Sequence, residues 1–279
     1  MRILKLSLRI VAAAFRHFLA DDGWAIASHI ALSTLMALFP FLIVVTALAG
    51  FFFGSKELAD EAAHILLEAW PKQVAGPIAL DVANVLTDTR GDVLTFGILF
   101  ALYFASSGVE SLRVGLNRAY DAVEQRSWWL LRLESIGYVL VGAVAILAFS
   151  FLVVLAPLIW GKLLHYVPML DPFSGLITRY AVAALVLVIA LMIVHLWLPA
   201  GRRDFGQIAP GIVATILLWL ISGAAFGRYL ANYAFAYISM YAGLASAMIA
   251  LVFLYVCASI FVYGAELNSV IGKTRMQTL

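Results

Sequence analysis

The sequence predicts an all-α, polytopic membrane protein with six transmembrane helices and both termini in the cytoplasm. Of the 279 residues, 64% are hydrophobic and only 12% are charged. A soluble domain is typically about half apolar and about one quarter charged, because its surface must be polar. The apolar residues also lie in long runs, and about 20 such residues are needed for a helix to cross a bilayer. We therefore expect one membrane domain over residues 1–279.

Six segments have the length and the apolar character of membrane spans. Three of them contain no Asp, Glu, Lys or Arg. The other three carry such a residue only near one end, where its side chain can reach the lipid headgroups. The predicted spans are approximately 30–53, 93–112, 136–160, 177–198, 208–230 and 242–264.

The distribution of Lys and Arg between the connecting segments predicts the orientation. Cytoplasmic connections of membrane proteins carry an excess of these two residues. The side that would hold both termini and the second and fourth connections has twice as many of them as the opposite side. We therefore place both termini in the cytoplasm.

Two further segments are expected to be helical but too polar to span. Residues 2–19 place Leu4, Leu8, Val11, Phe15 and Phe18 on one face and basic residues elsewhere. Such a helix is typical of the anionic cytoplasmic interface. Residues 54–92 form a helical periplasmic excursion between the first two spans, either an acidic cap over the bundle or a solvated hairpin that only covers helix ends.

Polar side chains inside or at the edge of the spans are the main candidates for function, because lipid makes them costly. In the cytoplasmic leaflet, four spans contribute His29, Ser33, Glu110, Arg113, Asn117, His195, Glu266 and Asn268. The spacing of Glu110, Arg113 and Asn117 puts them on one helix face. The eight residues either share a polar site or inward-facing vestibule, or each one caps or snorkels from its own helix.

Two sequence features concern helix geometry. Pro40 lies near the middle of the first span and removes a backbone hydrogen bond, which makes it a candidate hinge, with static bending as the alternative. Gly223 and Gly227 form a GxxxG pair, a pattern that permits close contact between helices. We expect that contact within the monomer rather than in a dimer.

No pattern indicates catalysis, a metal site or a cofactor. The histidines have no metal-ligand spacing, and no Gly-rich phosphate loop is present. The formal net charge of +2 does not favour binding to nucleic acid. We expect no catalytic residue, no metal and no cofactor, with membrane lipids as partners. The sequence leaves the oligomeric state open.

Several short motifs follow one another along nearly the whole chain. They are Ala27–Ser33 running to Phe39-Pro40, Ala105–Glu110, Leu116–Tyr120, Arg126–Trp129 continuing to Arg132-Leu133, Leu198-Pro199, Pro210-Gly211, Tyr241–Leu244 and Tyr263–Asn268. In this order they resemble the YihY/virulence factor BrkB family of bacterial inner-membrane proteins. One departure is Ala242, where the tyrosine is expected to be followed directly by glycine. The resemblance implies a six-span protein of the bacterial inner membrane.

The same resemblance implies little chemistry. The family has carried the label ribonuclease BN, but this sequence shows no acid–base pair or metal ligands near a basic groove, so we do not expect an enzyme. Members have also been discussed as transporters. One hypothesis is therefore a transporter or exporter of a small molecule or a lipid, in which Glu110 and Glu266 bind substrate or protons with Arg113 or His29 as a charge partner. The alternative is a non-transporting membrane partner that organises or regulates a cell-envelope complex.

Overall fold

The computed structural model describes residues 2–53, 94–166, 174–241 and 244–277, and these residues are almost entirely helical. The helices are α1 (Arg2–Ala20), α2 (Gly23–Phe53), α5 (Leu94–Ala119), α6 (Trp128–Tyr166), α7 (Ser174–Trp197), α8 (Phe205–Tyr241) and α9 (Ala245–Gln277). No residue in these four ranges belongs to a β-strand. The predicted all-α class is therefore confirmed for the described chain. The periplasmic excursion over 54–92 lies outside the described residues.

Four helices have described stretches that are long and apolar enough to cross a membrane. These stretches are Gly23–Val45 in α2, Trp128–Phe149 in α6, Phe205–Tyr233 in α8 and Ala245–Thr274 in α9, and α7 contributes a shorter apolar stretch, Ala183–Trp197. The chain is thus a membrane protein with several apolar helices. The count of six spans, and the placing of both termini in the cytoplasm, stay predictions.

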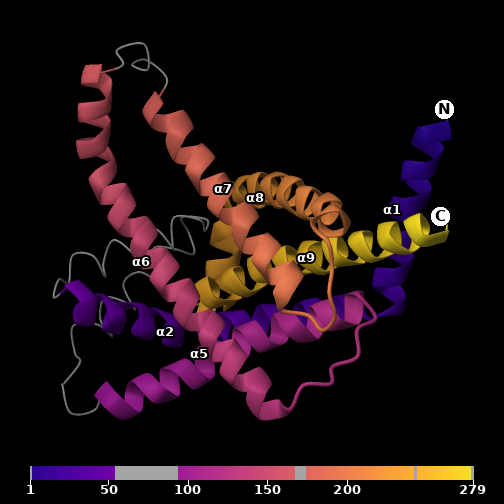
Figure 1. Cartoon of the computed structure of the whole chain (residues 1–279), viewed down its shortest axis with the longest axis horizontal. Coiled ribbons are helices and arrows are strands. Elements are labelled where there is room, and N and C mark those ends of the chain that lie inside the picture. Colours follow the sequence, from indigo (N-terminus) through magenta and orange to yellow (C-terminus); the bar gives the residue numbers. More distant parts are fainter. Residues whose placement is uncertain (1, 54–93, 167–173, 242–243, 278–279) are drawn as a thin grey trace.

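Helices α2 and α9 lie at the centre of the arrangement. α2 packs along α5 and α9, and α9 in turn contacts α8 on another side. α6 crosses α5 and α2, and α7 leans on α8 (Figure 1). The amphipathic α1 packs against α9, so the start of α1 and the end of α9 lie on the same side of the molecule (Figure 1). That side is the one where we predict the cytoplasm.

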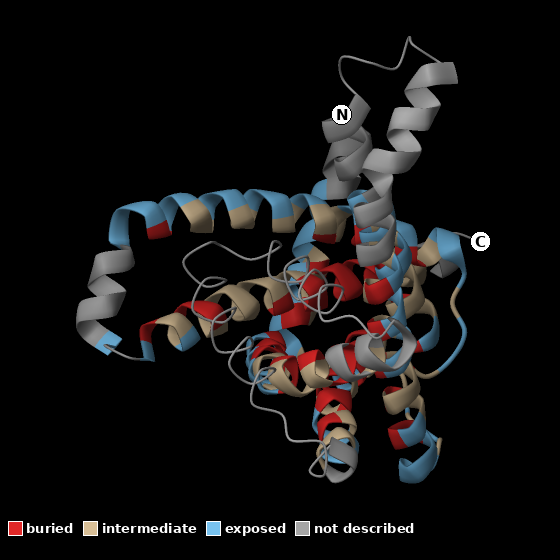
Figure 2. Ribbon diagram, turned by 90° about the vertical axis from the view of Figure 1, so that its left-hand side faces the viewer, coloured by how far each residue is buried: buried red, intermediate tan, exposed pale blue. Residues whose placement is uncertain are grey.

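The largest apolar core lies where six helices, α1, α2, α5, α7, α8 and α9, meet. It includes Leu116 at the end of α5, Leu198 just after α7, Ile208 at the start of α8 and Val262 in α9. A second core joins α2, α5 and α6 further along the bundle. Figure 2 shows the buried residues on the faces where helices meet and the exposed ones on the outward faces. The first core surrounds the polar side chains described below.

Helices α8 and α9 approach each other closely at two glycines. A Cβ atom built on Gly211 would lie 2.1 Å from the carbonyl oxygen of Gly264, and one built on Gly264 would lie 2.1 Å from Oγ1 of Thr215. No described atom lies within 4 Å of a Cβ built on Gly223 or Gly227. The close contact expected from the GxxxG pair is found instead at glycines on two different helices. α2 continues through Pro40 as one helix, and the hinge stays a prediction.

We expect Gly211→Ala to destabilise the protein, because its methyl group would press against the backbone of α9. Overpacking of this kind typically costs about 1–3 kcal/mol. Gly223→Ala, on the same helix, is the matched control and should be neutral or stabilising by up to about 1 kcal/mol, because alanine is the better helix former. Thermal unfolding of both variants in one detergent tests this. Equal melting temperatures for the two variants would contradict the close α8–α9 contact.

Candidate functional site

An ion cluster with two buried guanidinium groups joins α5 to α6. Arg113, three residues after Glu110 on α5, places its Nη2 3.0 Å from Oε1 of that carboxylate. Arg132 of α6 pairs with the other oxygen of Glu110 and also lies over the ring of Tyr103, with 3.7 Å from guanidinium carbon to ring centre. Arg113 and Arg132 are only 3% and 7% exposed. One carboxylate thus serves two buried guanidinium groups, whose desolvation it offsets.

A second polar network crosses the bundle end through Tyr120, which directly follows α5. Its hydroxyl lies 2.7 Å from Nδ1 of His195 on α7 and 3.2 Å from Nδ2 of Asn268 on α9. The backbone N–H of Gly211 on α8 donates to Oδ1 of Asn268 at 2.6 Å. The guanidinium of Arg203 covers the Tyr120 ring at 4.0 Å. Residues on or next to α5, α7, α8 and α9 are therefore joined by one short chain of hydrogen bonds.

The directions of these hydrogen bonds follow from the partner that each group needs. The N–H of Gly211 can only donate, so the atom that it meets is the oxygen of Asn268, and the Asn268 NH₂ group faces Tyr120. Burial raises the pKa of Tyr120 to about 12, so the phenol keeps its proton. If the phenol oxygen also accepted from Nδ1 of His195, the phenol proton would have no acceptor among the described residues, so the arrangement that satisfies both groups has the phenol donating to Nδ1. In this arrangement the histidine proton resides on Nε2.

Three polar atoms in or next to this network have no hydrogen-bond partner within the described structure. They are Nε2 of His195, Oγ1 of Thr215 and Nη1 of Arg203, and the side chains of His195 and Thr215 are fully buried. Buried polar groups in proteins are nearly always hydrogen-bonded, so each exception calls for an explanation such as a ligand or a bound water. Thr215 lies one helical turn after Gly211, at the α8–α9 contact.

Asn117 ties two connecting segments together rather than facing the first cluster. Its Oδ1 accepts from the backbone N–H of Ala200 at 2.7 Å, and its Nδ2 donates to Glu124 at 3.2 Å. The guanidinium of Arg126 donates to both oxygens of Glu124 and holds the pKa of that carboxyl at about 2. Arg126 also reaches Glu134 at 2.7 Å. This arrangement fixes the α5–α6 loop against the α7–α8 turn.

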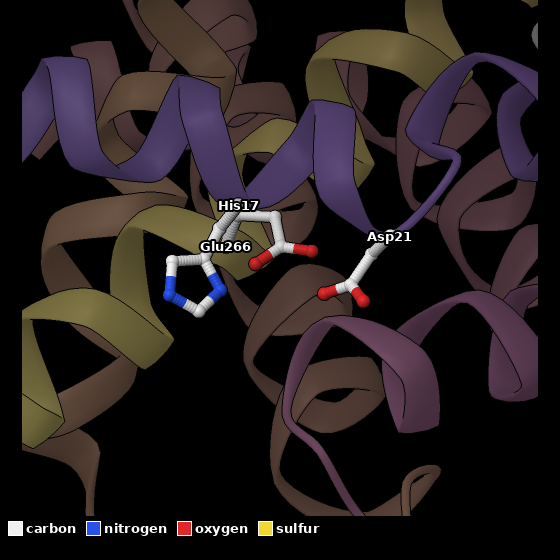
Figure 3. A group of neighbouring side chains, drawn as sticks. All are labelled: His17, Asp21 and Glu266. Atoms are coloured by element: carbon white, nitrogen blue, oxygen red, sulfur yellow. The ribbon is translucent and has the colours of Figure 1, made fainter.

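Glu266 lies on another side of α9, facing α1. Its side chain is fully buried, and neither carboxylate oxygen has a hydrogen-bond partner among the described residues. The potential ligand atoms of His17, Asp21 and Glu266 lie within 4.8 Å of one another. Figure 3 shows the Glu266 carboxylate between the His17 ring and the Asp21 carboxylate. Sequence spacing did not indicate this grouping, because two members lie at the C-terminal end of α1 and the third lies within α9, far away in the sequence.

The eight residues singled out by sequence are distributed over these arrangements. Glu110 and Arg113 share the ion cluster, whereas His195 and Asn268 are connected through Tyr120. Asn117 and Glu266 have the separate surroundings just described. His29 is exposed on α2, and Ser33 is partly buried on the same helix. A shared function for the eight residues stays a prediction.

Sequence reasoning missed several side chains of these clusters, of which Tyr120, His17, Asp21 and Arg132 are the most informative. Tyr120 could have been found from its position three residues after Asn117, on the same helical face. His17 and Asp21 have the i, i+4 spacing that places two side chains on one side of a helix. Arg132 carried no such signal, because its partner Glu110 lies on a different helix.

Comparison with known proteins identifies the family to which the chain belongs. A family model described as Virulence factor BrkB matches residues 14–278. The chain belongs to this family. The ribonuclease-like protein YfkH of Bacillus subtilis is 26% identical over 263 residues, which cover 94% of each chain. A UPF0761 membrane protein of Rhodospirillum centenum is 23% identical over 283 residues, which cover 95% of this chain and 58% of that protein.

No solved structure matches the chain. The family resemblance noted from short motifs is therefore confirmed by sequence comparison. The chain is a membrane protein of the BrkB family, and the word ribonuclease belongs to the name of its relative YfkH.

We expect Glu110→Gln to destabilise the protein strongly, because it removes the only negative charge shared by Arg113 and Arg132. Breaking a buried ion pair by removing one partner costs about 3–5 kcal/mol. Glu134→Gln is the matched control, because Glu134 is about as exposed as Glu110 (29% against 26%), but its partner Arg126 is itself 27% exposed and keeps Glu124. An exposed pair contributes at most about 1 kcal/mol. Denaturant unfolding in one detergent compares the two, and equal losses would contradict a buried ion cluster.

Proposed function

We propose that the protein moves lipid across the bacterial inner membrane, without an ATPase of its own. The observation that carries the proposal is the buried chain of hydrogen bonds from His195 through Tyr120 to Asn268 at one end of an apolar helix bundle. Ionisable and amide groups inside a membrane bundle are costly and typically mark a pathway or a proton relay. A protein that served only as a scaffold would have little reason to bury them there.

The atoms without hydrogen-bond partners support a network that opens and closes during transport rather than one that only holds the helices together. Nε2–H of His195 and Oγ1 of Thr215 offer hydrogen bonds that no described residue takes. Helices α8 and α9 touch through glycine backbones, so no large side chain interlocks them at this point. A shift of α8 along α9 would open the bond between Gly211 and Asn268 and give a lipid headgroup or a proton access to the network.

An apolar groove supports lipid as the substrate class. It lies between α1, α2 and α9 and is lined by Phe15, Phe18, Trp24, Ser259, Ile260 and Tyr263. The apolar side chains of Leu8, Val11 and Leu19 on α1 are exposed, as expected for a helix lying in the membrane interface. An acyl chain has the shape and the polarity to fill such a groove, whereas a small polar solute does not.

We expect Tyr120→Phe to slow lipid movement while leaving the fold intact, because only the hydroxyl between His195 and Asn268 is lost. The hydroxyl makes two hydrogen bonds, each with a net contribution of about 1 kcal/mol. Because about 1.4 kcal/mol of added barrier slows a reaction about tenfold, we expect a slowing of roughly ten- to thirtyfold. The measurement uses liposomes of phosphatidylethanolamine and phosphatidylglycerol containing a trace of NBD-labelled phospholipid. Bleaching by external dithionite then reports how fast label leaves the inner leaflet.

Tyr233→Phe, an exposed tyrosine on α8, is the matched control and should move lipid at the wild-type rate. If Tyr120→Phe lowered the melting temperature along with the rate of lipid movement, the network would serve only to stabilise the fold. Wild-type protein that moves none of phosphatidylethanolamine, phosphatidylglycerol and cardiolipin would contradict the proposal. A non-transporting role in an envelope complex would then be the better account.

A further inference from the structure

A separate group of polar side chains joins α1 to α9, away from the network through Tyr120. We propose that His17, Asp21 and Glu266 bind a divalent transition-metal cation. One imidazole and two carboxylates offer ligand atoms that all lie within 4.8 Å of one another. Figure 3 shows the three side chains converging from the end of α1 and from α9.

The state of Glu266 is the observation that points to a ligand. Its carboxylate is fully buried and meets no hydrogen-bond donor in the described part of the chain. A buried charge without a partner is strongly unfavourable, and a second carboxylate nearby adds repulsion. A cation between Glu266 and Asp21 would replace this repulsion with attraction on both sides.

The neighbouring basic side chains do not provide the positive charge that would balance the Glu266 carboxylate. Arg118 pairs with Asp21 at 3.3 Å, but its side chain is 57% exposed and it approaches Asp21 alone. Lys273, on the next turns of α9, pairs with Asp121 at 2.6 Å. Two carboxylates therefore face the site with one solvent-exposed guanidinium beside them, which leaves a negative charge for a divalent cation to balance.

The backbone keeps the two α1 ligands on the same side. The N–H of Asp21 donates to the carbonyl of His17 at 2.9 Å, which continues the helical spacing beyond the last residue of α1. Asp22 then adopts a left-handed conformation with φ of 55°, and the chain turns into α2. His17 and Asp21 thus project toward α9, where Glu266 meets them.

The donor set selects the class of cation. One nitrogen and two oxygen ligands suit Zn²⁺ or Mn²⁺, whereas Ca²⁺ and Mg²⁺ prefer oxygen alone and soft ions prefer sulfur. Zinc bonds of 2.0–2.2 Å in a tetrahedral site separate the ligand atoms by roughly 3.4 Å. A pair of ligand atoms at the 4.8 Å limit would therefore have to close by about 1.4 Å, a shift that the partly exposed His17 and Asp21 allow. The fourth position stays open to water.

A cation here would fasten the amphipathic helix α1 to the membrane helix α9. Phe18 and Tyr263, which line the apolar groove, lie one and three residues from the ligands His17 and Glu266. Metal binding would thus set how far α1 stands from α9 and how wide the groove is. Cation binding itself does not depend on lipid as the substrate, and the two proposals fail independently.

Calorimetric titration with ZnCl₂ and with MnCl₂ tests the site on chelator-treated full-length protein that carries no histidine tag. We expect one cation per chain, with affinity at least tenfold weaker in Glu266→Gln and in His17→Gln. Two matched controls, His29→Gln and Glu134→Gln, should bind the cation like wild type. They remove an exposed imidazole and a partly exposed carboxylate that lie outside the cluster. The proposal would be overturned if wild type bound neither metal at one cation per chain. Unchanged affinity in Glu266→Gln would overturn it as well.

Thermal unfolding gives a second readout if His17→Gln folds poorly. Without metal, Glu266→Gln should melt at or above the wild-type temperature, because an uncompensated buried charge is gone. A cation that binds only the folded state raises the melting temperature. Added Zn²⁺ or Mn²⁺ should therefore stabilise wild type but not Glu266→Gln, and equal stabilisation of both proteins would overturn the site. Neither readout involves lipid movement.

Discussion

The backbone contact between α8 and α9 at Gly211 and Gly264 is the constraint on which the polar end of the bundle depends. It brings the N–H of Gly211 to within 2.6 Å of Asn268 and thereby fixes which way that amide points. The Asn268 amide then donates to the phenol oxygen of Tyr120, which favours a phenol that donates to His195. A side chain at either glycine would separate the helices and leave these groups without partners inside an apolar environment, where the cost is highest.

Helix α9 connects two chemically different surroundings. Asn268 faces α8 and the network through Tyr120, whereas Glu266 faces α1. Two residues apart on a helix of 3.6 residues per turn point in roughly opposite directions. A rotation or shift of α9 would therefore alter both surroundings together. In the lipid-moving role that we propose, this links the position of the interfacial helix α1 to the state of the buried network.

The helices could largely be predicted from apolar runs, but their ends could not. The first apolar run begins near residue 30, whereas α2 starts at Gly23 directly after the turn at Asp22. α9 similarly continues to Gln277, well beyond the apolar run that ends near residue 264. Backbone hydrogen bonds continue along a helix beyond the hydrocarbon region of the bilayer. Hydropathy therefore predicts the membrane-embedded part of each helix but not its full length.

The polar clusters show which contacts local spacing can predict. Glu110 and Arg113 are three residues apart on one helix, and their pairing follows from that spacing. Arg132 beside Glu110, and Glu266 beside His17, depend on how separate helices rotate and cross. The glycines illustrate the same limit, because Gly223 and Gly227 carry the familiar pattern while the close approach is made by Gly211 and Gly264, single residues on two helices.

A double-mutant cycle on lipid movement, built from Tyr120→Phe and Asn268→Ala, tests the central claim that these side chains act as one network. Residues within one hydrogen-bond network typically show coupling energies of about 0.5–3 kcal/mol, whereas independent sites add. The account predicts that the double variant moves lipid about as slowly as the slower single variant. Rate losses that simply multiply would contradict it, because they would show that Tyr120 and Asn268 contribute separately.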